Sequence, residues 1–245
     1  MAEWNDPRTT SSPFGSRGPA LNGEALGAVT MDQGLRRYML SIYNYMASGV
    51  LLSGIVALLF ASSGLAAQVM ATPLRWVIVL APLAFIFFFS PARSQSTLKT
   101  MFWAFSAVMG LSLSALLLIY TGPSIALTFF ATAGAFAGLS LYGYTTKRNL
   151  SAIGSFLVMG VIGLIIAMLL NLWLASGPLA LAISALGVLI FAGLTAYDTQ
   201  RLRDAYYHVA GTDMMGKVVI LGALSLYLDF INMFQFLLSF LGSRD

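Results

Sequence analysis

Charged side chains are absent from two very long stretches of this sequence. Thr100 to Thr146 and Asn149 to Tyr197 contain no Asp, Glu, Lys or Arg. A helix of about 20 apolar residues crosses the hydrocarbon core of a bilayer, which is about 30 Å thick. Each stretch has room for two such helices, and the turn sequences TGPS and ASGP divide the stretches near their middles. We therefore expect these segments to lie inside a membrane.

The composition of the whole chain also indicates a membrane protein. It is 58% hydrophobic and only 9% charged, whereas a soluble domain uses about a quarter of its residues as charges. The sequence predicts an all-α, polytopic membrane protein with one domain, residues 36–242, preceded by a disordered cytoplasmic tail, residues 1–35, rich in Gly, Pro, Ser and Thr. Seven transmembrane helices are expected, at about 38–62, 74–91, 101–120, 124–144, 152–174, 179–200 and 217–241.

The positive charges of the loops predict an orientation. With seven spans, eleven Lys and Arg residues fall on one face, and only Arg75 and Arg244 fall on the other. Because positive loops stay in the cytoplasm, we expect a cytoplasmic N-terminus and an external C-terminus. The same loops account for the net charge of +4, so no nucleic-acid partner is needed to explain it.

The sequence lacks the residues that several kinds of metal site and enzyme active site require. The chain has no cysteine and a single histidine, His208, which excludes thiolate sites and a multi-histidine metal centre. No phosphate-binding loop, dinucleotide fingerprint, HExxH or GxSxG motif is present. We expect neither an enzyme nor a bound cofactor.

Two carboxylates lie within apolar helical sequence. They are Asp198, near the end of the sixth predicted span, and Asp229, within the seventh. A carboxylate there is costly unless it is neutral, paired or facing water, so it is a functional-site hypothesis by default. If the two acids face each other, they share a proton and titrate as a coupled pair. The sequence therefore predicts a pH sensor that needs no histidine.

Nearby polar side chains support this hypothesis. Ser225 and Asn232 share a helix face with Asp229, and Thr195 lies one turn before Asp198. These groups can donate hydrogen bonds to a buried carboxylate. The alternative is structural: Asp198 ends its helix at the membrane surface, paired with Arg201 or Arg203, and Asp229 serves packing.

Three further features each allow two interpretations. Pro82, in the middle of the second span, predicts a kink that serves either as a hinge or only as packing. Arg93 follows that span and could reach Asp198, or it is a solvated loop residue. Gly134 and Gly138 form a GxxxG motif, for which we expect helix packing inside the bundle rather than dimerisation.

Three blocks of sequence resemble the transmembrane Bax inhibitor motif family, whose founding member is Bax inhibitor-1. They are AGLSLYGYTTKRNLSAIGSFLVMGVIGLIIAMLLN, GLTAYDTQ and ALSLYLDFINMFQFLLSFLG. The likeness extends from about Arg36 to Gly242 and leaves out only the tail. The chain ends in GSRD, as in bacterial-looking members of the family, and this favours a bacterial inner membrane.

The resemblance implies seven helices with the last one central, and a calcium leak gated by pH. It assigns the proton sensor to a pair of aspartates in the YD and LDFIN motifs, which match Asp198 and Asp229. It also implies an arginine latch on the first aspartate, for which Arg93 is the candidate by position. We therefore expect Ca²⁺ to be the transported ion, with Asp198 and Asp229 as its ligands and the lipid bilayer as partner. The alternatives are a non-conducting regulator of other membrane proteins, such as a protease or a cell-death factor, and a proton-coupled transporter.

Overall fold

The regular structure is helical throughout the described part of the chain. The computed structural model describes residues 23–243, and their side chains from Gln33 onward. The helices of this part are α1 Gly23–Ser62, α2 Leu65–Met70, α3 Leu74–Ile86, α4 Gln95–Leu117, α5 Gly122–Thr145, α6 Ser151–Leu174, α7 Gly177–Val209 and α8 Met214–Leu241.

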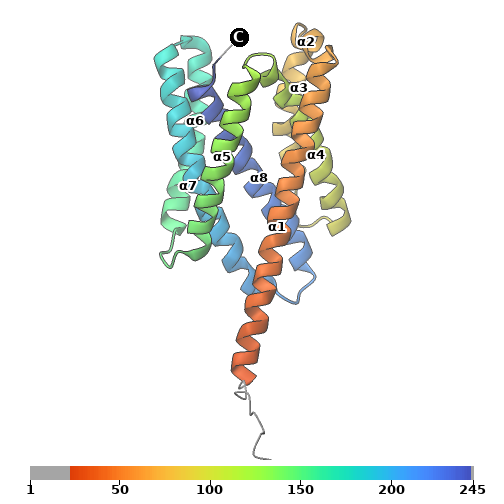
Figure 1. The fold of residues 1–245 in the computed structure, drawn as a ribbon, viewed down its shortest axis with the longest axis vertical. Helices are drawn as coiled ribbons and strands as arrows, with labels where there is room; N and C mark the ends of the chain where they lie inside the picture. Colours follow the sequence, from red (N-terminus) through yellow and green to blue (C-terminus); the bar gives the residue numbers. More distant parts are fainter. Residues whose placement is uncertain (1–22, 244–245) are drawn as a thin grey trace, which may run out of the picture.

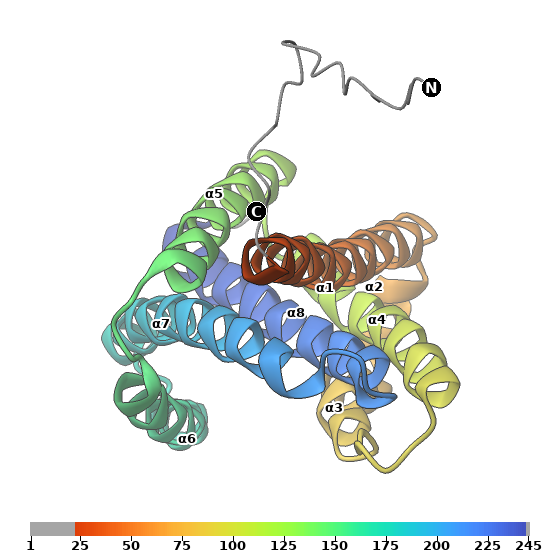
Figure 2. The same ribbon diagram turned by 90° about the horizontal axis from the view of Figure 1, so that it is seen from below.

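Helix α8 occupies the middle of the bundle. It packs against α1, α4, α5 and α7, which surround it in both views of the ribbon (Figures 1 and 2). Helix α6 packs on the outside of α7, and α3 packs on α4. The last helix is therefore the central one, and its side chains supply much of the core.

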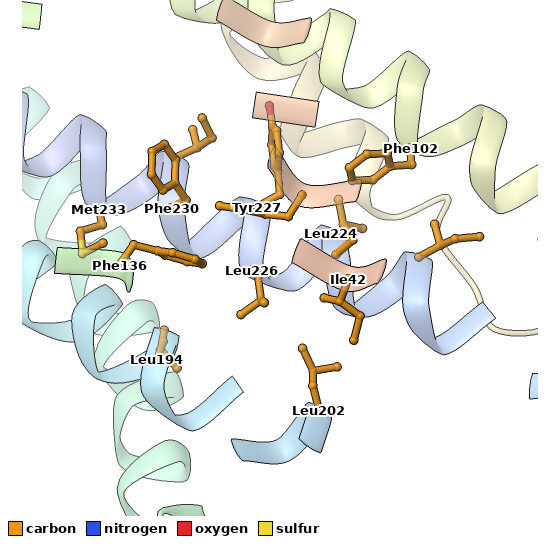
Figure 3. Close-up of a cluster of buried hydrophobic side chains, with 14 of the residues drawn as sticks. Ile42, Phe102, Phe136, Leu194, Leu202, Leu224, Leu226, Tyr227, Phe230 and Met233 are labelled. Atoms are coloured by element: carbon orange, nitrogen blue, oxygen red, sulfur yellow. The ribbon is translucent and has the colours of Figure 1, made fainter. Parts of the chain in front are cut away.

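The core forms where α8 meets its neighbours. Leu226 and Tyr227 of α8 are fully buried, together with Ile42 of α1 and Phe102 of α4 (Figure 3). The Tyr227 hydroxyl is 2.6 Å from Oγ of Ser53, and this oxygen also donates to the Ser106 carbonyl at 2.7 Å. One buried serine thus joins α1, α4 and α8, so no hydroxyl is left unsatisfied at this point of the core.

Six of the described helices are long and apolar enough to cross a membrane: Gln33–Ser62 within α1, and α4, α5, α6, α7 and α8. Helix α3 has 13 residues, about 20 Å at 1.5 Å per residue, which is less than the hydrocarbon thickness. It is shorter than the predicted span 74–91. Pro82 lies inside it, and after Ile86 the Phe88 and Phe89 amides donate to carbonyls only three residues back, so the α-helical pattern ends there.

Helix α3 packs beside α4 over part of the length of the bundle. In Figure 1 it descends from the end where α2 lies, and α4 starts near the opposite end and ascends beside α1. The described chain begins and finishes at opposite ends of the bundle (Figure 1).

Two helices extend beyond the predicted spans at the same end of the molecule. Helix α1 begins at Gly23, inside the tail predicted for residues 1–35, and residues 1–22 lie outside the described part. Lengthening an existing helix adds a hydrogen bond per residue without a new nucleation step, so such extensions form readily. Helix α7 continues past the predicted end at residue 200 to Val209 because Leu202 and Tyr206 are buried there.

The glycines of α5 separate into packed and open positions. A Cβ on Gly143 would collide with the backbone carbonyl of Ala196, so α5 and α7 approach closely at that point. A Cβ on Gly134 or Gly138 would meet no heavy atom within 4 Å among the described residues. The expectation that the GxxxG motif packs inside the bundle is therefore wrong. Its glycines lie on an open face of α5.

Candidate functional site

Asp198 lies inside helix α7, not at its end. The helix continues for 11 residues beyond it, to Val209, and Asp198 is only 7% exposed. Its neighbours along the chain, Ala196 and Thr199, are buried as well. The helix-end interpretation of Asp198 therefore does not fit the geometry, although its expected ion pair with Arg201 does form.

Asp198 is held by groups from two helices. Nη2 of Arg201, one turn later in α7, lies 3.4 Å from its Oδ1. Ser225 of α8 lies close enough to the same carboxylate for its hydroxyl to stabilise it, and Ser225 Oγ accepts a hydrogen bond from Arg201 at 3.2 Å. Aspartate, serine and arginine thus form a closed polar triangle between α7 and α8.

Asp229 is buried one turn further along α8. It is 5% exposed, and its Oδ2 has no hydrogen-bond partner among the described residues. The Asp198 carboxylate and the Arg201 guanidinium are the charges that act on it. The two acids that the sequence singled out are therefore brought within electrostatic reach of each other.

This arrangement suits a proton or a cation. Two buried carboxylates cannot both stay charged at low cost, and a bound proton or a metal ion relieves their repulsion. The unpartnered Oδ2 of Asp229 is a free acceptor for either. A buried polar atom of this kind calls for an explanation, and a transient ligand supplies one.

The site has few protein ligands for a metal. No group of three or more His, Cys, Asp and Glu side chains occurs among the residues that the structure describes. Calcium takes six to eight oxygen ligands, so water and uncharged oxygens would have to supply most of them. Two carboxylates alone therefore do not make a complete calcium-binding site.

Arg93 lies elsewhere in this conformation. Its Nε donates to the Phe88 carbonyl at 2.9 Å, and the loop that carries it is held to α8 by Lys217, whose Nζ donates to the Pro91 carbonyl at 3.2 Å. No ion pair between Arg93 and Asp198 occurs among the described residues, and Arg201 on the same helix pairs with the carboxylate instead. The spacing of three residues between Asp198 and Arg201 is the sequence signal for that pair.

The polar side chains that were expected to donate to the two carboxylates have other partners in most cases. Ser225 contacts Asp198 rather than Asp229. The Thr195 hydroxyl donates to the Phe191 carbonyl at 2.8 Å, and the Asn232 amide donates to the Leu228 carbonyl at 2.8 Å. Both therefore satisfy the backbone of their own helices. Pro82 is buried inside α3.

Two residues of the α5–α7 contact were not singled out by the sequence. Thr199 is fully buried beside Asp198 and donates to Oγ of Ser140 in α5 at 3.4 Å. A lone serine in a small-residue segment carries no signal that separates this pairing from ordinary packing. The tertiary structure alone identifies this hydrogen bond as a link between α5 and the acid site.

Comparisons with known proteins agree with the resemblance seen in the motifs. A family model described as "Inhibitor of apoptosis-promoting Bax1" matches residues 35–245. A protein of Rickettsia prowazekii, named as an uncharacterised protein, is 47% identical over 220 residues, which are 88% of this chain and 93% of that protein. The inner membrane protein YbhL of Escherichia coli is 43% identical over 218 residues, or 86% of this chain and 93% of YbhL. A Caulobacter vibrioides protein is 46% identical over 232 residues, with 88% and 92% covered.

Proposed function

Since the chain belongs to the Bax inhibitor-1-like family of membrane proteins, we propose that it is a pH-sensitive calcium leak channel. Asp198 and Asp229 form its proton sensor and part of its cation path. The observation that carries this proposal is the buried, unpartnered Oδ2 of Asp229 beside a second buried carboxylate. The chain acts as a channel rather than as an enzyme, and Ca²⁺ is its cargo.

The proposed switch depends on the ion pair of Asp198. Above the titration range of the acid pair, Asp198 is negative and attracts Arg201, which also holds Ser225 of α8. Protonation of Asp198 on acidification removes this attraction within α7, so Arg201 is no longer held beside Ser225 and the tie between α7 and α8 is loosened. Leak therefore increases as the pH falls.

The latch is assigned to Arg201 in the conformation described here. The Arg93 latch stays a prediction for another closed conformation, in which the α3–α4 loop would move toward α7. Pro82 would then serve as the hinge of α3, since a proline in a helix removes a backbone hydrogen bond.

The proposed topology counts α3 as a crossing. Seven crossings place the N-terminus in the cytoplasm and the C-terminus outside, as the loop charges favour. The direction of α3 in Figure 1 supports this count. We place the protein in a bacterial inner membrane, and the name of the inner membrane protein YbhL of Escherichia coli supports that location.

The test is Ca²⁺ flux from liposomes that contain the purified protein, measured across a pH series. We expect the wild-type leak to increase on acidification, by at most about tenfold per pH unit for a single proton. Asp229→Asn keeps the shape of the side chain but removes the carboxylate that is coupled to Asp198, so the rise in leak should shift to a more acidic pH.

Asp204→Asn is the matched control. Asp204 lies on α7 and is 55% exposed, in an ion pair with Arg203 at 2.8 Å. This variant should retain the wild-type pH profile. An unchanged pH dependence in Asp229→Asn would contradict the proposed sensor.

A non-conducting regulator is the second candidate. The open positions of Gly134 and Gly138 favour it, because small residues allow a partner helix to approach α5 closely. Liposomes that pass no ion at any pH would support this regulator and would exclude the channel. Flux that saturates with a substrate other than Ca²⁺ would instead indicate a proton-coupled transporter.

A further inference from the structure

A groove runs between α1 and α5 on the outside of the bundle. These two helices lie at the front of Figure 1, with α8 behind them. The groove has a volume of about 480 Å³, which falls within the range of small-molecule sites. Its walls are formed by Arg36, Met39, Leu40 and Tyr43 of α1 and by Phe136, Ala137, Ser140, Leu141 and Tyr144 of α5.

The walls of the groove are mainly apolar and face the surroundings of the bundle. Leu40 is 50% exposed and Leu141 is 64% exposed on opposite sides of it, and Phe136 is buried at its base. Apolar side chains exposed along a membrane-spanning helix contact hydrocarbon. A hydrocarbon chain therefore fits the chemistry of this surface.

One end of the groove carries a positive charge. Arg36 is exposed and lies at the start of the membrane-crossing part of α1. Its guanidinium is a bidentate donor suited to phosphate oxygens. A single cation at the end of an apolar groove is complementary to an amphiphile that has a phosphate at one end and a hydrocarbon chain at the other.

We infer that the α1–α5 groove binds one anionic phospholipid, with the phosphate on Arg36 and an acyl chain along Met39, Leu40, Phe136 and Leu141. The inference does not depend on the calcium leak, because it uses only the groove and its charge.

The bound lipid would cover a buried hydrogen bond between α5 and α7. Ser140 lines the groove and accepts the hydrogen bond of Thr199, the residue after Asp198. An acyl chain over Ser140 would therefore separate this buried polar region from the surrounding lipid.

Native mass spectrometry of the full-length protein tests the headgroup contact. The protein is released from nanodiscs that contain phosphatidylglycerol and phosphatidylcholine with the same acyl chains. We expect one retained phosphatidylglycerol per protein. Arg36→Gln should lower its retention about fivefold, the effect of losing one arginine near an anionic headgroup. Arg37→Gln is the matched control, since Arg37 is exposed on the same turn but does not line the groove, and it should retain the lipid.

A second pair of variants tests the path of the acyl chain. Ala137→Phe fills the groove and should reduce retention of the lipid, whereas Ala135→Phe lies on α5 outside the groove and should not. Equal retention by the two arginine variants, or by the two alanine variants, would overturn the inference. So would a protein dimer that forms through α5 and excludes the lipid.

Discussion

At the scale of single residues, the Asp198 carboxylate is fixed by side chains from two helices. Arg201 supplies the charge, and Ser225 supplies a hydroxyl that also accepts from Arg201. Charge-assisted hydrogen bonds of this kind are stronger than neutral ones. Because Arg201 is half exposed and Asp198 is buried, the pair lies at the boundary between the bundle and its surroundings.

Arg201→Gln should imitate protonation of Asp198. The variant removes the same attraction, so we expect its leak at neutral pH to increase toward the wild-type leak at acidic pH. Arg93→Gln should change the leak much less, because Arg93 holds the Phe88 carbonyl in this conformation. Liposome Ca²⁺ flux at neutral pH compares the two variants. A large increase in Arg93→Gln, with none in Arg201→Gln, would reassign the latch to Arg93.

At the scale of elements, α5 and α7 approach each other closely where α5 has a glycine. Gly143 has no Cβ, and the Ala196 carbonyl occupies the space that a Cβ would need. The close approach occurs two residues before Asp198 and brings Ser140 within hydrogen-bonding distance of Thr199. Nearby, the Gln200 amide donates to the Arg148 carbonyl at 2.8 Å, and its Oε1 accepts from the Leu150 amide at 2.8 Å. Helix α5 and the loop after it therefore position the acid site from one side.

Gly143→Ala should destabilise the bundle by about 1–3 kcal/mol, the usual cost of overpacking, because the backbone atoms it meets cannot rotate away. Gly134→Ala on the same helix is the control. It meets no neighbour, so we expect it to be neutral or to stabilise α5 by about 0.5–1 kcal/mol. Unfolding of the two variants in detergent micelles measures the difference. Equal destabilisation by both variants would show that the α5–α7 contact is looser than described.

At the scale of the whole molecule, α3 decides the topology. If only the six long helices of the described residues crossed the membrane, the start of α1 and the α7–α8 loop would lie on opposite faces of it. Counting α3 as a crossing places them on the same face. In Figure 1 the start of α1 and the α7–α8 loop lie toward the same end of the bundle.

The chain has no cysteine of its own, so single cysteines can report this topology directly. We expect Gln33→Cys and Thr212→Cys to react with a membrane-impermeant maleimide from the cytoplasmic face. Ser63→Cys, in the turn between α1 and α2, should react only from outside. All three positions are exposed. Labelling of Thr212→Cys from outside would mean that α3 does not cross the membrane.

The sequence by itself determined the class of the protein and the identity of its two buried acids. Long charge-free segments have one physical solution, helices in a bilayer, because backbone groups in hydrocarbon must satisfy their own hydrogen bonds. Burying a carboxylate in such a segment costs several kcal/mol, so the sequence alone identifies Asp198 and Asp229 as unusual.

Only the tertiary structure decided how those acids are surrounded. The helix rotations and the close approach at Gly143 place Ser225 on Asp198, turn Thr195 and Asn232 to their own backbones, and leave Arg93 on its own loop. Those placements depend on packing between residues far apart in the chain, and the hydropathy of the sequence does not predict that packing.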